Sequence, residues 1–411
     1  MSIPQQLQFG LQRLAGFSSN SLRVLPLNTQ SFSASQQCII RLPVNSTIDL
    51  HSLALHFNAT PTLGVLPVQS SELIGRLEIL VNGSSIFGQA LQEYNTLSKV
   101  FHNLICGQDK IQEQAVYSTG TAPATLAGYL NGNTATTVGS TSPLIVDNWV
   151  GFLGGNYQRF IDTSVLGSVE IRLTWSPSAV ITPTAAAAGG QSFTVSNVEL
   201  LVETIEFADN WFQRSLQSAL SSGSLLLPYK NFASFNYYIG AGSGNINTSY
   251  ASESLDVLYA FLRLGDYNSA TANTTLAGVQ DAHYFDFRSD GATHQFRVNN
   301  AMMPTFQATT QEAYTLMKNA VNGGGYNLGY KNVIATPAVW GAGKFTFAQS
   351  LKFKDDENLS KYSSGLNTNQ SQIPLSYNFS GASGSSYAPV IIAETTSYLE
   401  IGAGQNIVYH P

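Results

Sequence analysis

Segments of similar residue pattern occur twice in this chain of 411 residues, and they occur in the same order. The matched pairs are 25–32 with 227–235, 48–57 with 254–261, 77–83 with 294–300, and 92–99 with 311–318. Chance explains one such match, whereas four in the same order favour a duplicated domain with loops of different length. We therefore expect two similar domains in tandem.

The stretch from 195 to 235 has the pattern of a joint between two such domains. Apolar and polar residues nearly alternate over 195–207, which predicts a half-buried strand. Apolar residues then recur at helical spacing up to residue 220, with Asp209 as N-cap and Gly223 as C-terminal stop. A new strand is predicted over 225–235. The alternative is an ordinary crossover inside one large sheet.

Each half contains several short strands and one helix. In the first half, 76–81 alternates and ends at the turn pair Asn82-Gly83, and residues 115–150 are typical of a long loop. In the second half, Thr309 and Glu312 form a capping box that opens the helix. Roughly eight strands in about 200 residues are typical of a jelly roll.

The sequence thus predicts an all-β fold of two tandem eight-stranded jelly rolls, with short helices in loops and at the inter-domain link. The predicted divisions are an N-terminal arm at 1–20, a first jelly roll at 21–207, a linking helix at 208–224 and a second jelly roll at 225–411. The arm has apolar residues at helical spacing from Ile3 to Leu14. It either lies on a partner or membrane surface, or is a short helix or loosely ordered terminus of its own domain.

The composition is poor in charge. Charged residues make up 11% of the chain, against about 25% in average soluble proteins, while 43% are hydrophobic. Such a surface suits a protein that is covered by neighbouring molecules, and the alternative is a loop-rich monomer. The net charge of −6 argues against direct binding of nucleic acid, which requires clustered Lys and Arg.

Cys38 and Cys106 lie far apart, and two cysteines in so long a chain do not form a disulfide scaffold. We expect both to be free and buried, with assembly in a reducing compartment, although a bridge between them stays open. We expect no signal peptide in residues 1–16, which lack a continuous apolar core, and no membrane-spanning run of 18 apolar residues.

Residues that could carry chemistry are scattered. His51 and His56 are five apart on a predicted strand and are expected on opposite faces. His283 and His294 flank a predicted turn and are a weak candidate for a metal site, which would need Asp281 or Asp286 as a further ligand. Residues 355–358 could bind calcium, but a solvated acidic loop is the preferred interpretation. We predict no catalytic residues, no metal site and no cofactor.

The chain resembles the major capsid proteins of the double-jelly-roll virus lineage, and it is most similar to the type found in polinton-like viruses and virophages. The segments that carry the resemblance are 76–83, 160–171, 196–235, 295–299 with Pro304, 364–368 and 398–401. It covers nearly the whole chain from about residue 22. The family has no catalytic residues, so the resemblance implies that this protein is not an enzyme.

The resemblance implies a capsid protein of the virion, assembled inside the host cell. It implies a pseudo-hexameric homotrimer that tiles an icosahedral shell with neighbouring trimers. Vertex (penton) and minor capsid proteins are the expected partners, and residues 1–20 are expected on the inner side, near a membrane or minor protein. The loops at 115–150 and 265–283 are expected to face outward or a neighbour.

Two other functions remain open from the residues. One is a carbohydrate-binding jelly-roll protein, a fibre or lectin, for which Tyr237, Tyr238 and Tyr284 are candidate aromatic contacts. The other is a β-rich hydrolase, which requires two convergent carboxylates that no pattern singles out.

Overall fold

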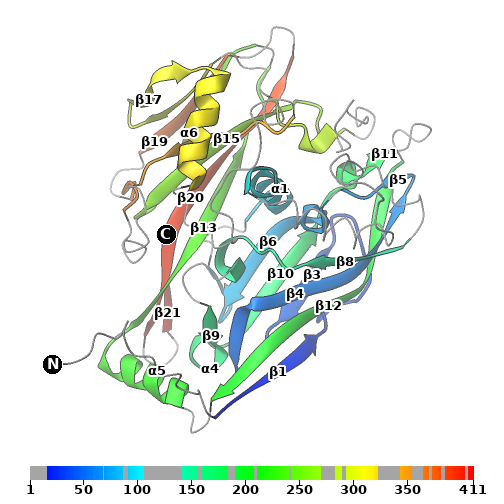
Figure 1. Cartoon of the computed structure of the whole chain (residues 1–411), viewed down its shortest axis with the longest axis vertical. Coiled ribbons are helices and arrows are strands. Elements are labelled where there is room, and N and C mark those ends of the chain that lie inside the picture. Colours follow the sequence, from blue (N-terminus) through cyan, green and yellow to red (C-terminus); the bar gives the residue numbers. More distant parts are fainter. Residues whose placement is uncertain are drawn as a thin grey trace, which may run out of the picture.

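The computed structural model describes the chain in ranges separated by gaps. The described residues are 16–67, 69–86, 91–105, 141–154, 159–183, 190–207, 211–240, 242–269, 283–288, 293–322, 343–352, 364–369, 373–380, 385–402 and 406–411. They form mainly antiparallel β-sheet with a few short helices. Figure 1 shows two β-rich halves, coloured blue to green and green to red, that lie side by side.

The first half forms two facing antiparallel sheets. Its strands are β1 (Phe17–Val24), β2 (Phe32–Ser33), β3 (Gln37–Arg41), β4 (Thr47–Thr62), β5 (Gly64–Val65), β6 (Ile74–Val81), β7 (Ser84–Ser85), β8 (Ser142–Val146), β9 (Phe160–Asp162), β10 (Val169–Trp175), β11 (Thr182–Pro183) and β12 (Ser192–Phe207). One sheet has the order β1-β12-β4-β8, and the other has the order β3-β10-β6-β7. Trp175 of one sheet packs on Phe57 of the other, with ring centres 5.0 Å apart. The two sheets therefore enclose one core.

The second half repeats this arrangement. Its strands are β13 (Leu225–Asn236), β14 (Gly244–Ser249), β15 (Leu255–Leu264), β16 (His294–Val298), β17 (Ala301–Ala308), β18 (Phe347–Ser350), β19 (Pro374–Phe379), β20 (Tyr387–Gly402) and β21 (Asn406–His410). The two sheets have the orders β13-β20-β15-β18 and β14-β19-β16-β17. Phe347 of the first sheet stacks on Phe296 of the second, 5.0 Å between ring centres.

The strand orders of the two halves are equivalent, and each is the order of a jelly roll. The helices also correspond, because α1 (Tyr94–Ile105) lies between β7 and β8, and α6 (Thr310–Asn322) lies between β17 and β18. Three of the four matched pairs fall on equivalent elements: 48–57 and 254–261 on β4 and β15, 77–83 and 294–300 on β6 and β16, and 92–99 and 311–318 on α1 and α6. The fourth match is wrong, because 25–32 follows β1 whereas 227–235 lies within β13, the counterpart of β1. The predicted double jelly roll is confirmed.

The joint between the halves is the strand–helix–strand unit predicted from the sequence. In β12, Leu200 and Val202 are buried while Glu199 and Glu203 are half-buried, as the alternation predicts. The strand is followed by helix α5 (Trp211–Ser222) and then by β13. Since β12 pairs with β1, β2 and β4, and β13 pairs with β20, α5 connects two separate sheets. The alternative of a crossover within one sheet is wrong.

Two predicted boundaries are corrected by strand pairing. Residues 17–20, assigned to the N-terminal arm, begin β1, in which Phe17 pairs with Phe207 and Asn20 with Thr204. Within the predicted loop at 115–150, residues 142–146 form β8, which pairs with β4. The first segment lacks a strong apolar pattern, and its pairing with β12 decides its conformation. The second carries Leu144, Ile145 and Val146, a short apolar run that the prediction of a loop overlooked. Residues 1–15, 106–140 and 270–282 lie outside the described residues.

Two local predictions, the start of the helix in the second half and the burial of Cys38, are tested by the described residues. The main-chain N–H of Thr309 donates to the Glu312 carboxylate at 2.8 Å, which is the bond that Glu312 makes in a capping box, and the Thr309 hydroxyl donates to the same carboxylate at 2.9 Å. The N–H contact, followed by the hydroxyl contact, lowers the pKa of Glu312. Cys38 is free and buried, and burial raises its pKa to about 12. Cys106 lies outside the described residues.

Candidate functional site

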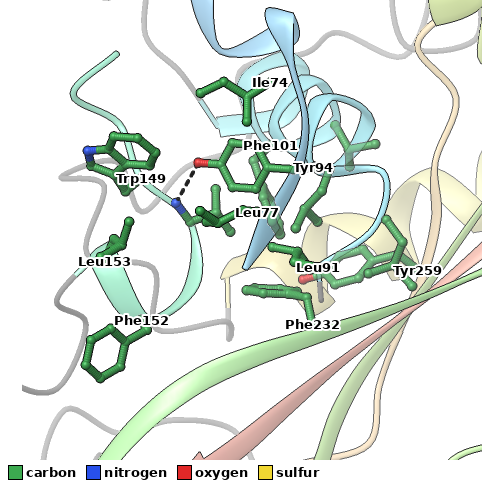
Figure 2. Packing of buried hydrophobic residues seen from close by; sticks show 14 of the residues in the cluster. Ile74, Leu77, Leu91, Tyr94, Phe101, Trp149, Phe152, Leu153, Phe232 and Tyr259 are labelled. Carbon is green, nitrogen blue, oxygen red and sulfur yellow. Dashed lines mark hydrogen bonds between the residues drawn. The ribbon is translucent and has the colours of Figure 1, made fainter. Parts of the chain in front are cut away.

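Helix α1 of the first jelly roll packs against the sheet of the second. The ring of Phe101 lies 5.6 Å from that of Phe232 in β13 and 5.7 Å from that of Tyr259 in β15, both in edge-on geometry. Figure 2 shows these three rings together with Tyr94, which lies on the same helix. All four side chains are buried. The helix that the sequence places in a loop of the first domain therefore supplies the core of the contact between the two domains.

The one-turn helix η3 (Gly151–Gly154) extends this contact. Its Phe152 ring meets the Tyr229 ring of β13 edge-on at 5.4 Å. The Tyr229 hydroxyl donates to the main-chain carbonyl of Ile86 in the first jelly roll. Tyr94 in turn accepts a hydrogen bond of 3.2 Å from the Val150 amide, drawn as the dashed line in Figure 2. Buried apolar area and satisfied polar groups thus alternate along the joint.

A buried ion pair also joins the two jelly rolls. Arg263 of β15, fully buried, lies 3.1 Å from the carboxylate of Glu93, the residue before α1. The guanidinium also stacks on the Tyr267 ring, 3.7 Å from its centre. The hydroxyl of Tyr284 donates to the same carboxylate at 3.3 Å. Glu93 has φ of 57°, a conformation uncommon for a residue with a side chain, so the cluster holds it in a costly backbone state.

The cluster controls the ionisation of its members. Burial by itself raises the pKa of Glu93, but the charge and hydrogen bond of Arg263, with those from Thr96 and Tyr284, outweigh burial and hold this pKa below its usual value. Burial likewise opposes the charged form of Arg263, but the attraction and hydrogen bond of Glu93, together with the interactions of Tyr284 and Tyr267, outweigh burial and raise the pKa of Arg263. The ion pair is therefore fully charged at neutral pH, which fixes the orientation of one jelly roll against the other.

Two edge strands expose apolar side chains instead of burying them. In β1 nearly every residue is exposed, and Phe17 and Leu22 retain 53% and 40% of their surface. In β17, Met302 and Phe306 retain 45% and 47%. Figure 1 places β1 and β17 on opposite flanks of the molecule. Among the described residues, β1 pairs only with β12 and β17 only with β16, so each is an edge strand of its sheet there.

The metal and calcium candidates do not form a site in the described part of the chain. His294 is buried, and its Nδ1 lies 2.8 Å from the Tyr377 hydroxyl among aromatic rings. Asp286 pairs with Arg288 at 2.6 Å. His51 is exposed and His56 half-buried, separated by a register shift of β4 that changes the simple alternation. Among the described residues, no three His, Cys, Asp or Glu side chains gather as metal ligands. Asp281 and residues 355–358 lie outside the described ranges.

The tyrosines considered for carbohydrate binding do not form an exposed platform. Tyr284 is buried in the contact between the jelly rolls, and Tyr238 is 69% exposed. The hydroxyl of Tyr237 donates to the Asn247 carbonyl at 3.2 Å. These positions place the three rings in different environments, and the carbohydrate-binding alternative is not favoured.

The structure brings together ionisable residues that the sequence pattern did not reveal. Glu93 and Arg263 are one pair, and Lys230 with Asp256 and Glu394 forms a second, buried cluster. Asp256 and Glu394 are two convergent carboxylates, but 2% and 0% exposure closes them to a polysaccharide. Contacts over such sequence separations leave no local periodic signal. None of the described helices has the length and apolar character needed to cross a bilayer.

Solved structures of viral capsid proteins share this fold. PBCV-1 VP54, in a structure fitted into a cryo-EM reconstruction of the virophage Sputnik, superposes with a TM-score of 0.64 at 12% identity, over 98% of this chain and 99% of that chain. The Faustovirus major capsid protein superposes with a TM-score of 0.61 at 10% identity, over 95% of this chain and 92% of that chain. The mavirus major capsid protein superposes with a TM-score of 0.54 at 9% identity, over 100% of this chain and 93% of that chain.

No protein-family model and no curated protein sequence matches the chain. At these identities the structural similarity defines the fold class. The chain has the double-jelly-roll fold found in viral major capsid proteins, over nearly its full length.

Proposed function

We propose that this protein is a viral major capsid protein and that it resides in the virion shell. The observation that carries the proposal is the pair of jelly rolls with equivalent strand orders, fixed to one another by the buried contact of α1. Similarity along the whole chain to three proteins described as capsid components supports it. The role is structural, and we propose no catalytic activity.

We further propose that three copies assemble into a ring. Two similar jelly rolls in each chain give six similar units around a threefold axis, which produces a nearly hexagonal outline suited to tiling a shell. A ring of this kind uses heterologous contacts, in which two different surfaces of the chain meet. The opposite flanks that carry β1 and β17 are two such surfaces, since each exposes apolar side chains on an edge strand of its sheet.

The modules that form this ring are residues 17–207 and 225–411, joined by a linker at 208–224 that contains α5. The first begins at Phe17 instead of residue 21, because β1 starts there. Vertex and minor capsid proteins are the further partners we propose, with no sequence-specific nucleic-acid binding. Contact of the N-terminal arm with a membrane or minor protein is tested by deletion of residues 1–15, which leaves β1 whole.

Electron microscopy of the purified protein tests the proposed function. We expect particles with threefold symmetry and a nearly hexagonal outline, and arrays or shells at high concentration. Variants that disturb β1 or β17 are imaged in the same way, and we expect fewer threefold particles from them than from the parent protein. Isolated single chains at all concentrations, with an elongated two-lobed outline, would contradict the proposal.

A further inference from the structure

Three ionisable side chains lie buried together on one sheet of the second jelly roll. Lys230 is on β13, Glu394 on β20 and Asp256 on β15, and β20 is the strand between the other two. Lys230 and Asp256 are each 2% exposed, and Glu394 is fully buried. The ammonium nitrogen of Lys230 contacts Asp256 Oδ2 and lies 3.4 Å from Glu394 Oε1. One amine thus faces two carboxylates without access to bulk water.

Asp256 is held in place by the shape of its strand. The register of β15 on β20 shifts between Leu255 and Val257, which makes Asp256 the extra residue of a β-bulge. Its Oδ1 accepts a hydrogen bond of 2.8 Å from the Ser254 hydroxyl, and its Oδ2 accepts one of 2.6 Å from Thr396. A side chain at Gly365 would approach Oδ1 to 2.4 Å, so only glycine fits there. The carboxyl group is therefore oriented toward Lys230.

Glu394 is oriented in the same way, and aromatic rings cover the cluster. The Tyr259 hydroxyl donates to Glu394 Oε2 at 2.8 Å. Phe232 is the strand partner of Glu394, and both Phe232 and Tyr259 pack on Phe101 of α1. The joint between the jelly rolls thus excludes water from the three groups. A fixed geometry and the exclusion of water favour attack of an amine on a carboxyl group when a further carboxylate is placed to transfer the protons.

We propose that Lys230 and Asp256 become joined by an intramolecular amide (isopeptide) bond. The neutral Lys230 nitrogen attacks Cγ of the protonated Asp256 carboxyl group, and a C–N bond forms. Glu394 takes a proton from the nitrogen and delivers it to the departing hydroxyl, so one C–O bond breaks and one water molecule leaves. No oxidant or reductant is required, and Glu394 is regenerated.

The cluster provides a physical reason for this reaction. Two opposite charges in a dry interior carry a desolvation cost, whereas an amide is neutral and hydrogen-bonds to the same neighbours. The bond would tie β13 to β15 across β20 and close a loop between residues 26 apart. Cross-links of this kind restrict the unfolded chain. The proposal does not depend on the capsid function.

Intact mass spectrometry of the full-length folded protein tests the proposal. We expect the mass to be lower than the sequence mass by one water molecule. Trypsin cleaves after Lys and Arg, so cleavage after Lys230 should be lost and a peptide spanning 215–263 should carry the missing water. A full sequence mass, with normal cleavage after Lys230, would overturn the proposal.

Variants assign the roles of the three residues. Lys230→Arg keeps a cation beside both carboxylates but has no reactive amine, so the full mass is expected. Asp256→Asn should lose ammonia in place of water, and Glu394→Gln should slow the reaction strongly. Reaction of Glu394→Gln at the parent rate would overturn the role of Glu394. Lys99 and Glu72 form a buried pair at 2.8 Å and serve as the internal control, since their peptides should remain linear.

Discussion

Arg263 and Glu93 form a buried ion pair at 3.1 Å across the contact between the two jelly rolls, although 170 residues separate them. Phe101, Phe232 and Tyr259 make the apolar part of the same contact. The two domains are therefore joined by packing and by charge, and not only by the linker. A rigid pair of jelly rolls is what a shell-forming tile requires.

Removal of the carboxylate should weaken the folded protein markedly. Glu93→Gln leaves the Arg263 guanidinium buried without its anion, and we expect a loss of about 3–5 kcal/mol in unfolding free energy. Denaturant unfolding measures this. The matched control is Glu199→Gln, which removes a surface pair with Arg23, whose side chain is 66% exposed, and should cost less than about 1 kcal/mol. Equal losses for the two variants would contradict the structural role of the buried pair.

The same carboxylate predicts an acid sensitivity. The pKa of Glu93 is lower in the folded protein than its ordinary value of 4.5, so the folded state gains stability from this group above that value. The gain is lost as the pH falls below 4.5 and through the lowered folded pKa. Unfolding measured from pH 7 down to pH 3 should show less of this acid loss in Glu93→Gln than in the parent. Identical pH profiles would contradict the assignment.

The aromatic contact is tested by truncation. Phe101→Ala removes the ring that packs on Phe232 and Tyr259, and the resulting cavity should cost about 3–5 kcal/mol of unfolding free energy. Phe306→Ala, at an exposed position, should change the stability of the isolated chain by less than about 0.5 kcal/mol. If Phe101→Ala is as stable as Phe306→Ala, α1 does not support the joint.

The exposed edge strands predict where assembly is sensitive. The double variant Met302→Glu and Phe306→Glu should reduce trimer formation at least tenfold in apparent affinity, because charge is placed in an apolar contact, while the unfolding midpoint of the chain stays the same. Val44→Glu is the control, since Val44 is 59% exposed but lies outside the strands. Sedimentation velocity measures trimer formation in both variants. Unchanged assembly of the β17 variant would remove this strand from the proposed interface.

The sequence predicted the parts of the fold that depend on local pattern. Alternation in β12, the contact of Glu312 with the Thr309 N–H at the start of α6 and the order of the repeated elements all follow from neighbouring residues, and all three are present in the structure. The resemblance and the duplication together predicted the double jelly roll.

The remaining features depend on contacts across the chain. β8 has a short apolar run, Leu144 to Val146, at the end of a stretch rich in small polar residues, and its pairing with β4 defines it as a strand. The cluster of Lys230, Asp256 and Glu394 draws on three strands, and a β-bulge decides where Asp256 points. Pattern within a single strand carries no information about such a bulge or about which charged residues meet. Tertiary pairing therefore determined what local propensity left undefined.

Mass photometry of the purified chain under native conditions is the most direct measurement of the central claim, that two equivalent jelly rolls let three copies close into a nearly hexagonal tile. We predict a dominant species of three times the chain mass. A population that stays at the mass of one chain, at every concentration and salt condition that keeps the protein folded, would contradict it.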